Sequence, residues 1–171
     1  LASGEIERID VAFPVLHGKN GEDGTIQGIF DLAGIPYVGC GLLASAMCMD
    51  KAVTNAMADF SGIDQAKWTA FDKHAYSVNK TALLEGAAEK LGFPIFVKPA
   101  NAGSSVGISL AENREELYNS LEDAFRYATV VLVEKAITNL VEINCRQIRD
   151  YSLDKHKRVF ETAQQDGCVI E

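Results

Sequence analysis

The chain has 171 residues and a formal net charge of −8, and 47% of its residues are hydrophobic. This length suits one ordinary domain or two small ones, and the apolar content is sufficient for a core, which excludes wholesale disorder. The acidic balance argues against a nucleic-acid partner, because phosphate backbones bind basic surfaces, although a nucleotide site needs only a few cations.

The sequence contains neither a secretory signal nor an apolar run of about 18 residues, so we expect no membrane partner. The cysteines lack the C-x-x-C spacing of zinc and thioredoxin-type sites; they are Cys40, Cys48, Cys145 and Cys168. Free thiols suit a reducing cytoplasm, where we expect the protein to work, and pairing in an oxidising compartment is the alternative.

The first predicted elements form a strand–loop–helix unit. Apolar residues at 11–16 predict a strand, and the spacing of apolar residues at 25–33 predicts a helix. Asp23 stands where the N-cap of that helix belongs, and Gly34 ends it. In such units the loop at the carboxyl end of the strand carries ligands, so residues 17–24 are a candidate binding loop.

Three further features follow before the middle of the chain. Residues 37–39 predict a short strand, and residues 42–60 predict a mostly helical segment that contains Lys51. Residues 61–64 break this pattern, and we therefore expect a boundary between two subdomains there.

The second half of the chain alternates helices and strands. The predicted elements are, in order, a strand at 67–71, a Lys- and Asn-rich turn, a helix at 81–91, strands at 94–97 and 108–110, a helix from 113 or 114 to 127, and a strand at 130–133. This alternation predicts a layered α/β sheet. After Cys145 the regularity is lost, and one helix at about 157–165 is predicted.

The loop at 98–107 is rich in small residues and lies between two predicted strands. Gly103 and Gly107 allow the backbone to approach a ligand closely, while Ser104 and Ser105 add hydroxyl groups. With the ammonium of Lys98 at its root, this composition suits phosphate binding. The loop lacks the Gly-Lys-Ser/Thr ending of a Walker A motif. A hairpin that only turns the chain is the alternative.

Four motifs in this order resemble those of the D-alanine–D-alanine ligase family. They are His17-Gly-x-x-Gly-Glu-Asp-Gly with Gln27-Gly28, Cys48-Met49-Asp50-Lys51, Lys98-Pro99 with Gly103-Ser-Ser-Val-Gly107, and Val133-Glu134-Lys135. The run from Phe13 to Lys19, together with Gly39-Cys40, is similar to the glycopeptide-resistance ligases of that family.

The resemblance implies an α+β ATP-grasp fold that is incomplete here. Residues 1–62 would form part of a small amino-terminal α/β substrate domain, and residues 63–145 the central ATP-grasp subdomain. Residues 146–171 resemble fragments of the carboxy-terminal subdomain that follow one another directly, with the residues between them missing. The first strand of the family, with its Gly-Gly-x-Ser element, would precede residue 1, and the arginine that stabilises the oxyanion has no counterpart here.

The resemblance also implies an enzyme. It would use ATP and Mg²⁺ to join D-alanine to a second D-amino or D-hydroxy acid through an acyl phosphate, for peptidoglycan precursors, as a cytoplasmic homodimer. Alternatives are another ATP-grasp carboxylate–amine ligase, against which the motif at 17–28 speaks, and a nucleotide-binding remnant without catalysis. The acceptor stays open, although His156, if it stands in the mobile loop, would favour D-lactate.

The site residues implied by the resemblance fall into three groups. Those expected to orient substrate are His17, Glu22 and Ser104. Those expected to contact the nucleotide are Lys51, Lys98, Gly103, Ser104, Ser105, Val106, Glu134, Lys135, Ile137 and Glu142. The expected metal ligand is Glu171; Glu142-Ile143-Asn144 spells the Glu-x-Asn of the metal pair but lies too early in the chain. Phosphoryl transfer needs cations, such as Lys51 and Lys98, around the phosphates.

Overall fold

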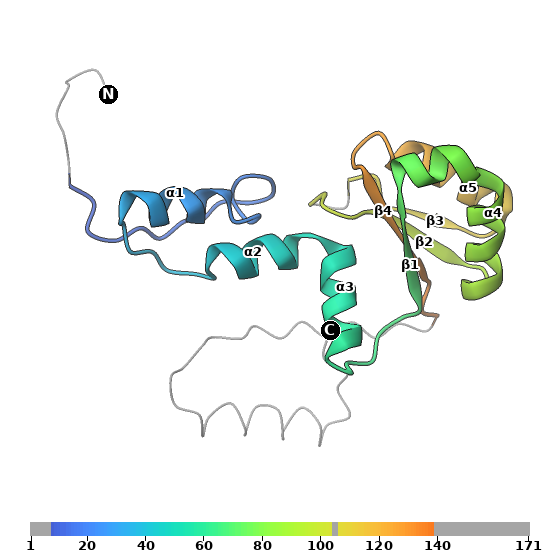
Figure 1. Ribbon diagram of the computed structural model, residues 1–171, viewed down its shortest axis with the longest axis horizontal. Coiled ribbons are helices and arrows are strands. Elements are labelled where there is room, and N and C mark those ends of the chain that lie inside the picture. Colours follow the sequence, from blue (N-terminus) through green and yellow to red (C-terminus); the bar gives the residue numbers. More distant parts are fainter. Residues whose placement is uncertain (1–7, 104–105, 139–171) are drawn as a thin grey trace. The chain divides into compact units, whose positions relative to one another are not determined.

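The computed structural model describes residues 8–103 and 106–138, and the described residues up to Ala136 belong to one compact unit (Figure 1). Its elements in chain order are α1 (Thr25–Ala33), α2 (Leu42–Met49), α3 (Lys51–Phe60), β1 (Trp68–Asp72), α4 (Lys73–Leu91), β2 (Ile95–Pro99), β3 (Ser109–Ala111), α5 (Arg114–Ala124) and β4 (Val130–Lys135). The predicted division of the chain near residue 62 stays a prediction.

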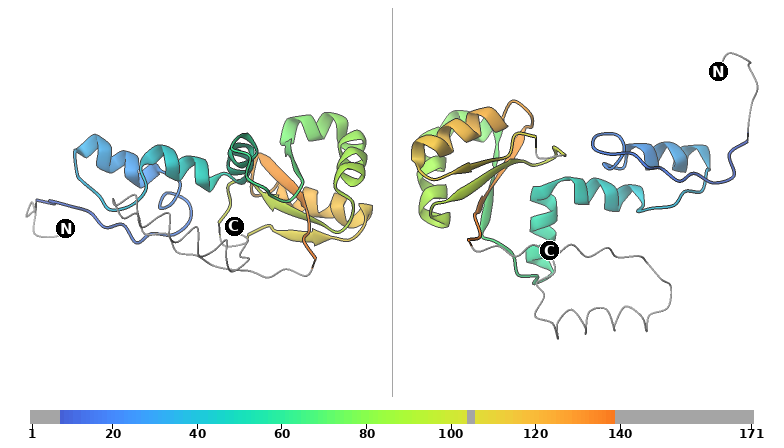
Figure 2. Two further views of the ribbon diagram at one scale, coloured as in Figure 1. Left: turned by 90° about the horizontal axis from the view of Figure 1, so that it is seen from below. Right: turned by 180° about the vertical axis from the view of Figure 1, so that it is seen from behind.

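The four strands form one sheet in the order β1-β4-β2-β3, and every neighbouring pair is antiparallel. The predicted mixture of helices and strands is therefore confirmed. Helices α4 and α5 cover one face of this sheet (Figure 2). The core lies between them and the sheet, and its fully buried side chains include Ile95, Val97, Leu117, Leu121, Val131 and Val133.

The opposite face of the sheet carries a different set of side chains. Because side chains alternate along a strand, Phe96 and Lys98 point away from the core that Ile95 and Val97 enter. Register pairs Lys98 with Leu132 and Phe96 with Glu134, so these four residues share the open face. A polar pair thus lies next to an apolar one on the side of the sheet without α4 and α5.

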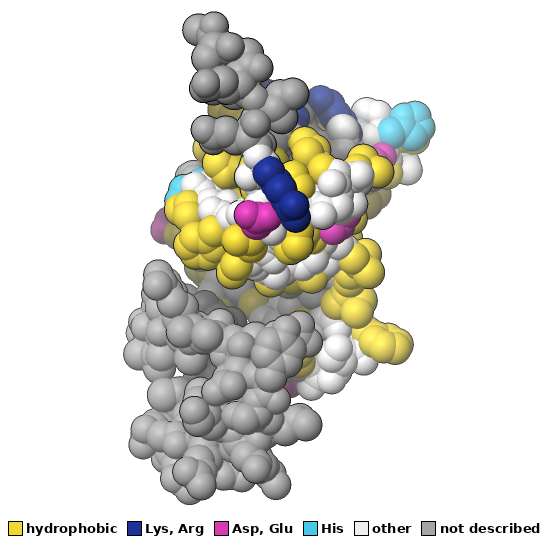
Figure 3. All heavy atoms as spheres, turned by 90° about the vertical axis from the view of Figure 1, so that its left-hand side faces the viewer, with side chains coloured by type: hydrophobic (Ala, Val, Ile, Leu, Met, Phe, Trp, Pro, Cys, Tyr) yellow, Lys and Arg dark blue, Asp and Glu magenta, His cyan; other side chains and the backbone are white. Residues whose placement is uncertain are grey.

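The strands predicted at 11–16 and 37–39 were wrong. Ala12 and Tyr37 form one isolated parallel bridge, and neither segment is otherwise extended into a sheet within the described residues. Several apolar side chains of this region are exposed, including that of Phe13 at 73%, and Figure 3 shows apolar side chains at the surface on this side. An apolar segment needs a sheet partner to become a strand, and its composition alone does not supply one.

The single helix predicted at 42–60 is two helices, α2 and α3, separated at Asp50. The backbone of Asp50 is extended, and its carboxylate accepts hydrogen bonds from the amides of Ala52 and Val53, at 2.9 and 3.1 Å. Aspartate favours such N-cap geometry over a helix interior because its side chain competes for backbone donors. As a result Lys51 is the first residue of a helix rather than an interior one.

The Lys- and Asn-rich turn predicted after β1 was also wrong, because residues 73–80 form the first half of α4. Asp72 caps this helix by accepting from the amides of His74 and Ala75. A kink at Asn79, with φ −127° and ψ 38°, separates that half from the predicted helix at 81–91. The predicted helix at 113–127 ends earlier, at Ala124.

The N-cap of α1 is Gly24 and not Asp23. Gly24 has a φ of 88°, and a Cβ atom there would lie 2.7 Å from the carbonyl oxygen of Leu42, so α2 packs closely against this point. Asp23 instead accepts from the amides of Asn20 and Thr25, at 2.9 and 3.0 Å. The Asn20 amide is the main cause of a lowered pKa for the Asp23 carboxyl, with Thr25 second.

No helix among the described residues is both long and apolar enough to cross a membrane. Of the four cysteines in the sequence, Cys40 and Cys48 lie in described segments, where both are exposed free thiols.

Candidate functional site

An ion pair on the open face of the sheet forms the centre of the site. The ammonium of Lys98, on β2, donates to the carboxylate of Glu134, on β4. Both side chains are mostly buried, with 25% and 17% of their surfaces exposed. The Lys98 ammonium also lies 5.3 Å from the centroid of the Phe96 ring. Two residues predicted from separate motifs are thus brought into direct contact by strand pairing.

Lys51 enters the same region from the first turn of α3. Its ammonium donates to the carbonyl oxygens of Ala102, at 2.8 Å, and Pro99, at 3.3 Å. Its backbone N–H donates to the carbonyl of Ala100, at 2.8 Å. Three contacts therefore join this lysine to the segment that leaves the end of β2.

The two lysines influence each other electrostatically. Burial is the main cause of a lowered pKa for Lys51, and the positive charge of Lys98 is the second cause, while Asp50 and Glu134 act in the opposite direction. Two ammonium groups and one carboxylate consequently share a small, half-buried volume. An anion placed there would relieve the repulsion between the two lysines, which is the electrostatic character of a phosphate site.

The loop after β2 continues from this cluster. The amide of Val106 donates to the carbonyl of Gly103 at 3.2 Å. Gly107 has a φ of 72°, and a Cβ atom there would lie 2.8 Å from Pro99 Cγ and from Tyr127 Cδ2. The loop can therefore pack this closely against the end of β2 and against Tyr127 only because this residue is glycine. The predicted Ser104 and Ser105 lie outside the described residues.

The predicted binding loop at 17–24 meets the loop after β2 at two glycines. A Cβ atom on Gly103 would lie 3.6 Å from the Cα of Gly18. His17, which precedes this contact, is exposed, and the carboxylate of Glu22 accepts a hydrogen bond from the Gly18 amide. The motif that contains His17 and the motif that contains Lys98 are therefore neighbours in space.

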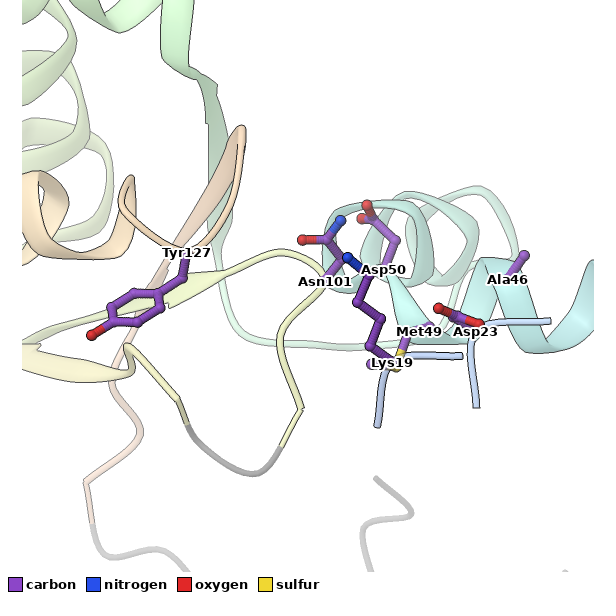
Figure 4. Close-up of a pocket in the computed structure, with 7 residues that line it drawn as sticks. All are labelled: Lys19, Asp23, Ala46, Met49, Asp50, Asn101 and Tyr127. Atoms are coloured by element: carbon purple, nitrogen blue, oxygen red, sulfur yellow. The ribbon is translucent and has the colours of Figure 1, made fainter. Parts of the chain in front are cut away.

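A pocket of about 300 Å³ opens where these loops and the junction of α2 and α3 come together (Figure 4). Its lining residues are Lys19, Asp23, Ala46, Met49, Asp50, Asn101 and Tyr127. In Figure 4 the side chain of Lys19 extends toward Asp50 and Asn101. A second pocket of about 300 Å³ lies on the other side of the same loop, against α1, and is lined by Leu16, His17, Lys19, Asn20, Gly21, Thr25, Ile26 and Ile29.

Lys135 and Ile137, which were predicted to contact the nucleotide, are not part of the cluster around Lys51 and Lys98. The ammonium of Lys135 donates to the carbonyls of Gly92 and Phe93, at 3.1 and 2.7 Å, and so fastens the end of β4 to the connection between α4 and β2. Ile137 follows β4 and is exposed. The predicted Glu142 and Glu171 lie outside the described residues. The functional roles of all these residues stay predictions.

The structure adds residues to the site that the motifs did not single out. Asn101 and Tyr127 line the pocket although neither belongs to a position predicted to act. Lys19 stands within the His17 motif, and that neighbourhood was the only available signal for it. Tyr127 lies far along the chain, after α5, and only its packing against Gly107 reveals it.

A metal centre is not formed by the described residues alone. Within residues 8–103 and 106–138 there is no group of three or more His, Cys, Asp or Glu side chains that could hold a metal ion. The cations and backbone groups of the cluster suit anionic oxygens instead.

Two family models match the sequence. Residues 57–166 match the model described as the D-ala D-ala ligase C-terminus, and residues 2–40 match the model described as the D-ala D-ala ligase N-terminus. A D-alanine–D-alanine ligase of Caldicellulosiruptor bescii is 53% identical over 137 residues, which are 80% of this chain and 37% of that protein. One from Enterococcus gallinarum is 49% identical over 135 residues, 78% of this chain and 43% of that protein.

Solved structures give the same result. The VanG D-Ala:D-Ser ligase of Enterococcus faecalis superimposes with a TM-score of 0.71 at 46% identity, over 78% of this chain and 38% of that one. The D-alanine–D-alanine ligase of Coxiella burnetii superimposes with a TM-score of 0.72 at 30% identity, over 80% of this chain and 40% of that one. The chain thus spans about two fifths of the length of the relatives that it matches.

Proposed function

Because the chain belongs to the D-alanine–D-alanine ligase family, we propose that it takes part in the ATP-dependent ligation of D-alanine to a second D-amino or D-hydroxy acid. The dipeptide or depsipeptide formed would serve peptidoglycan synthesis in the cytoplasm. The observation that carries this proposal is the cluster of Lys51, Lys98 and Glu134 beside the glycine-rich loop.

The cluster provides the charges that phosphoryl transfer to a carboxylate requires. Such a reaction spreads negative charge over the phosphoryl oxygens, so catalysis depends on positioning and on cations held in place. Lys98 is pre-positioned by its ion pair with Glu134, and Lys51 by the loop carbonyls that it contacts. Neither ammonium has to be ordered when the phosphates arrive, which reduces the entropic cost of binding.

The open face of the sheet offers a surface for the base and ribose. Phe96 supplies apolar area, while Glu134 supplies carboxylate oxygens that accept hydrogen bonds from ribose hydroxyls or an amino group. Glu134 would therefore connect the phosphate end of the nucleotide, through Lys98, to the polar edge of the nucleoside.

The loop at 17–24 would contribute to the part of the site where the amino-acid substrate binds. The close approach of Gly18 to Gly103 supports a place for His17 and Glu22 near the proposed phosphate site. The imidazole of His17 would orient the first substrate by hydrogen bonding, and Ser104 would help to orient the carboxylate that is phosphorylated.

Mg²⁺ commonly binds through one or two carboxylates together with the phosphates of its nucleotide. The described residues do not supply a metal cluster of their own, so Glu171 and residues like it would have to contribute. The homodimer and the identity of the acceptor are further parts of the proposal. D-Alanine, D-serine and D-lactate are the candidates, since the relatives include a ligase named for D-serine.

Two measurements test the proposal. Calorimetry should detect binding of ATP with Mg²⁺ to the chain, and phosphate release by the intact enzyme should depend on D-alanine. Product analysis with D-alanine, D-serine and D-lactate supplied together would identify the acceptor. ATP binding without D-alanine-dependent phosphate release would favour a nucleotide-binding remnant, whereas release that depends on a different carboxylate would favour another ATP-grasp ligase.

A further inference from the structure

Helix α3 forms hydrogen bonds at both of its ends with residues in or next to the strands of the sheet. At its first residue, Lys51 contacts the segment that leaves β2. In its last turn, the carboxylate of Asp59 accepts from the indole N–H of Trp68, at 3.0 Å, and from the amide of Gln65. Trp68 is the first residue of β1. The position of Lys51 is therefore set by the helix and not by a flexible side chain alone.

The contacts of Lys51 concentrate on four consecutive residues. Its ammonium reaches the carbonyls of Pro99 and Ala102, and its amide reaches the carbonyl of Ala100. The amide of Ala100 in turn donates to Val130, at 3.0 Å, which connects the same segment to β4. An ammonium group has three N–H donors, and two of them are used by carbonyl oxygens of the protein.

We propose that Lys51 is a positioning residue that holds the root of the glycine-rich loop, residues 99–102, in place before any nucleotide binds. It acts through the backbone of the loop, and its third N–H donor, which has no acceptor among residues 8–103 and 106–138, would bind a phosphate oxygen. This inference rests on the proposed function for the identity of the ligand. The contacts of Lys51 with residues 99–102, which we call the latch, are a property of the nucleotide-free protein.

The geometry favours this role over that of a simple phosphate ligand. A lysine that serves only an anion keeps its ammonium in solvent until the anion arrives, because charged groups are costly to bury. Lys51 is half-buried, and this burial is the main cause of its lowered pKa. Its ammonium is nevertheless hydrogen-bonded to carbonyl oxygens. A loop that is fixed in advance loses less conformational freedom when the ligand binds.

Amide hydrogen exchange of the nucleotide-free chain tests the latch. We expect the Ala100 amide to exchange about tenfold faster in Lys51→Met than in the wild type, because opening of the segment no longer breaks the charged hydrogen bonds. Lys51→Arg should restore most of the protection, since a guanidinium also donates to carbonyls. Lys67→Met is the matched control, because Lys67 is exposed, and it should leave the exchange unchanged.

A measurement on the wild type avoids any dependence on the folding of a variant. A lysine-selective ¹⁵N spectrum of the nucleotide-free chain should contain a protected Nζ resonance that disappears in Lys51→Arg. The absence of that resonance, or equal Ala100 exchange in wild type and Lys51→Met, would overturn the inference. Failure of the wild type to bind ATP would instead remove the proposed function and leave the latch standing, so the two failures are distinguishable.

Discussion

Lys98 and Glu134 face each other diagonally across β2 and β4, and their side chains form an ion pair on the open face of the sheet. Each residue comes from a separate sequence motif, and the antiparallel register brings them together. The pair joins a cation suited to phosphate with a carboxylate suited to hydroxyl or amino groups. It is therefore the natural starting point for testing the site.

Replacement of Lys98 by alanine should weaken ATP binding while the fold is retained. The hydrophobic core lies on the other face of the sheet, so loss of this side chain removes a cation rather than core packing. We expect at least a tenfold loss of affinity in calorimetry, which corresponds to about 1.4 kcal/mol. Thermal unfolding is the check on the fold, and Lys67→Ala is the control. Unchanged ATP turnover would remove Lys98 from the mechanism.

The coupling between Lys98 and Glu134 can be measured by a double-mutant cycle. Because both groups are mostly buried, we expect Lys98→Met and Glu134→Gln to be non-additive in the free energy of unfolding, by roughly 0.5 to 3 kcal/mol. Each single variant leaves one partly buried group without its partner, and the double variant does not. Urea unfolding of the four proteins at one pH gives the value. Additive effects would mean that the ion pair contributes little to folding.

Gly107 should be the least replaceable glycine of the loop. Its φ is 72°, and a Cβ atom would lie 2.8 Å from Pro99 and Tyr127, so Gly107→Ala combines backbone strain with a clash. We expect a loss of about 1 to 3 kcal/mol in the free energy of unfolding. Gly86→Ala is the matched control, because Gly86 lies within α4 with nothing within 4 Å of a Cβ atom there. That change should be neutral or stabilise by up to about 1 kcal/mol. Equal effects of the two changes would contradict this account.

The contact between α4 and α5 should make stability depend on acidity. Lys80 donates to Glu122 at 2.6 Å, and this hydrogen bond is the main cause of a lowered pKa for the Glu122 carboxyl. A carboxyl with a lower pKa in the folded state than its usual 4.5 stabilises the fold above that value. The contribution is lost as the pH falls through the folded pKa.

We therefore expect the free energy of unfolding to fall more steeply below about pH 4.5 in the wild type than in Lys80→Met. Urea unfolding between neutral and acid pH measures both slopes, and Lys67→Met controls for the loss of a positive charge. The same slope in wild type and Lys80→Met would show that this ion pair does not contribute to the acid transition.

The sequence by itself determined the central strands and the motif residues. Apolar runs at 94–97 and 130–133 correspond to β2 and β4, because short apolar runs rich in β-branched residues favour strands. The helix at 25–33 was found from its periodicity and its terminal glycine. Local composition was sufficient to select Lys98 as a candidate, since the chemistry of phosphate recognition restricts the residue types, whereas Lys51 and Glu134 were candidates through the family resemblance of their motifs.

Tertiary structure alone decided how these residues meet. Nothing in the spacing of Lys98 and Glu134 indicates an ion pair, because register depends on which strands pair and in which direction. Asp50 reads as part of one long helix until its carboxylate is seen to cap the next, and residues 73–80 read as a turn until Asp72 caps α4. The caps at Asp50 and Asp72 are local contacts that a helical periodicity does not register. Register and the contacts of Lys51 arise between distant parts of the chain, whereas periodicity reports only on neighbours along it.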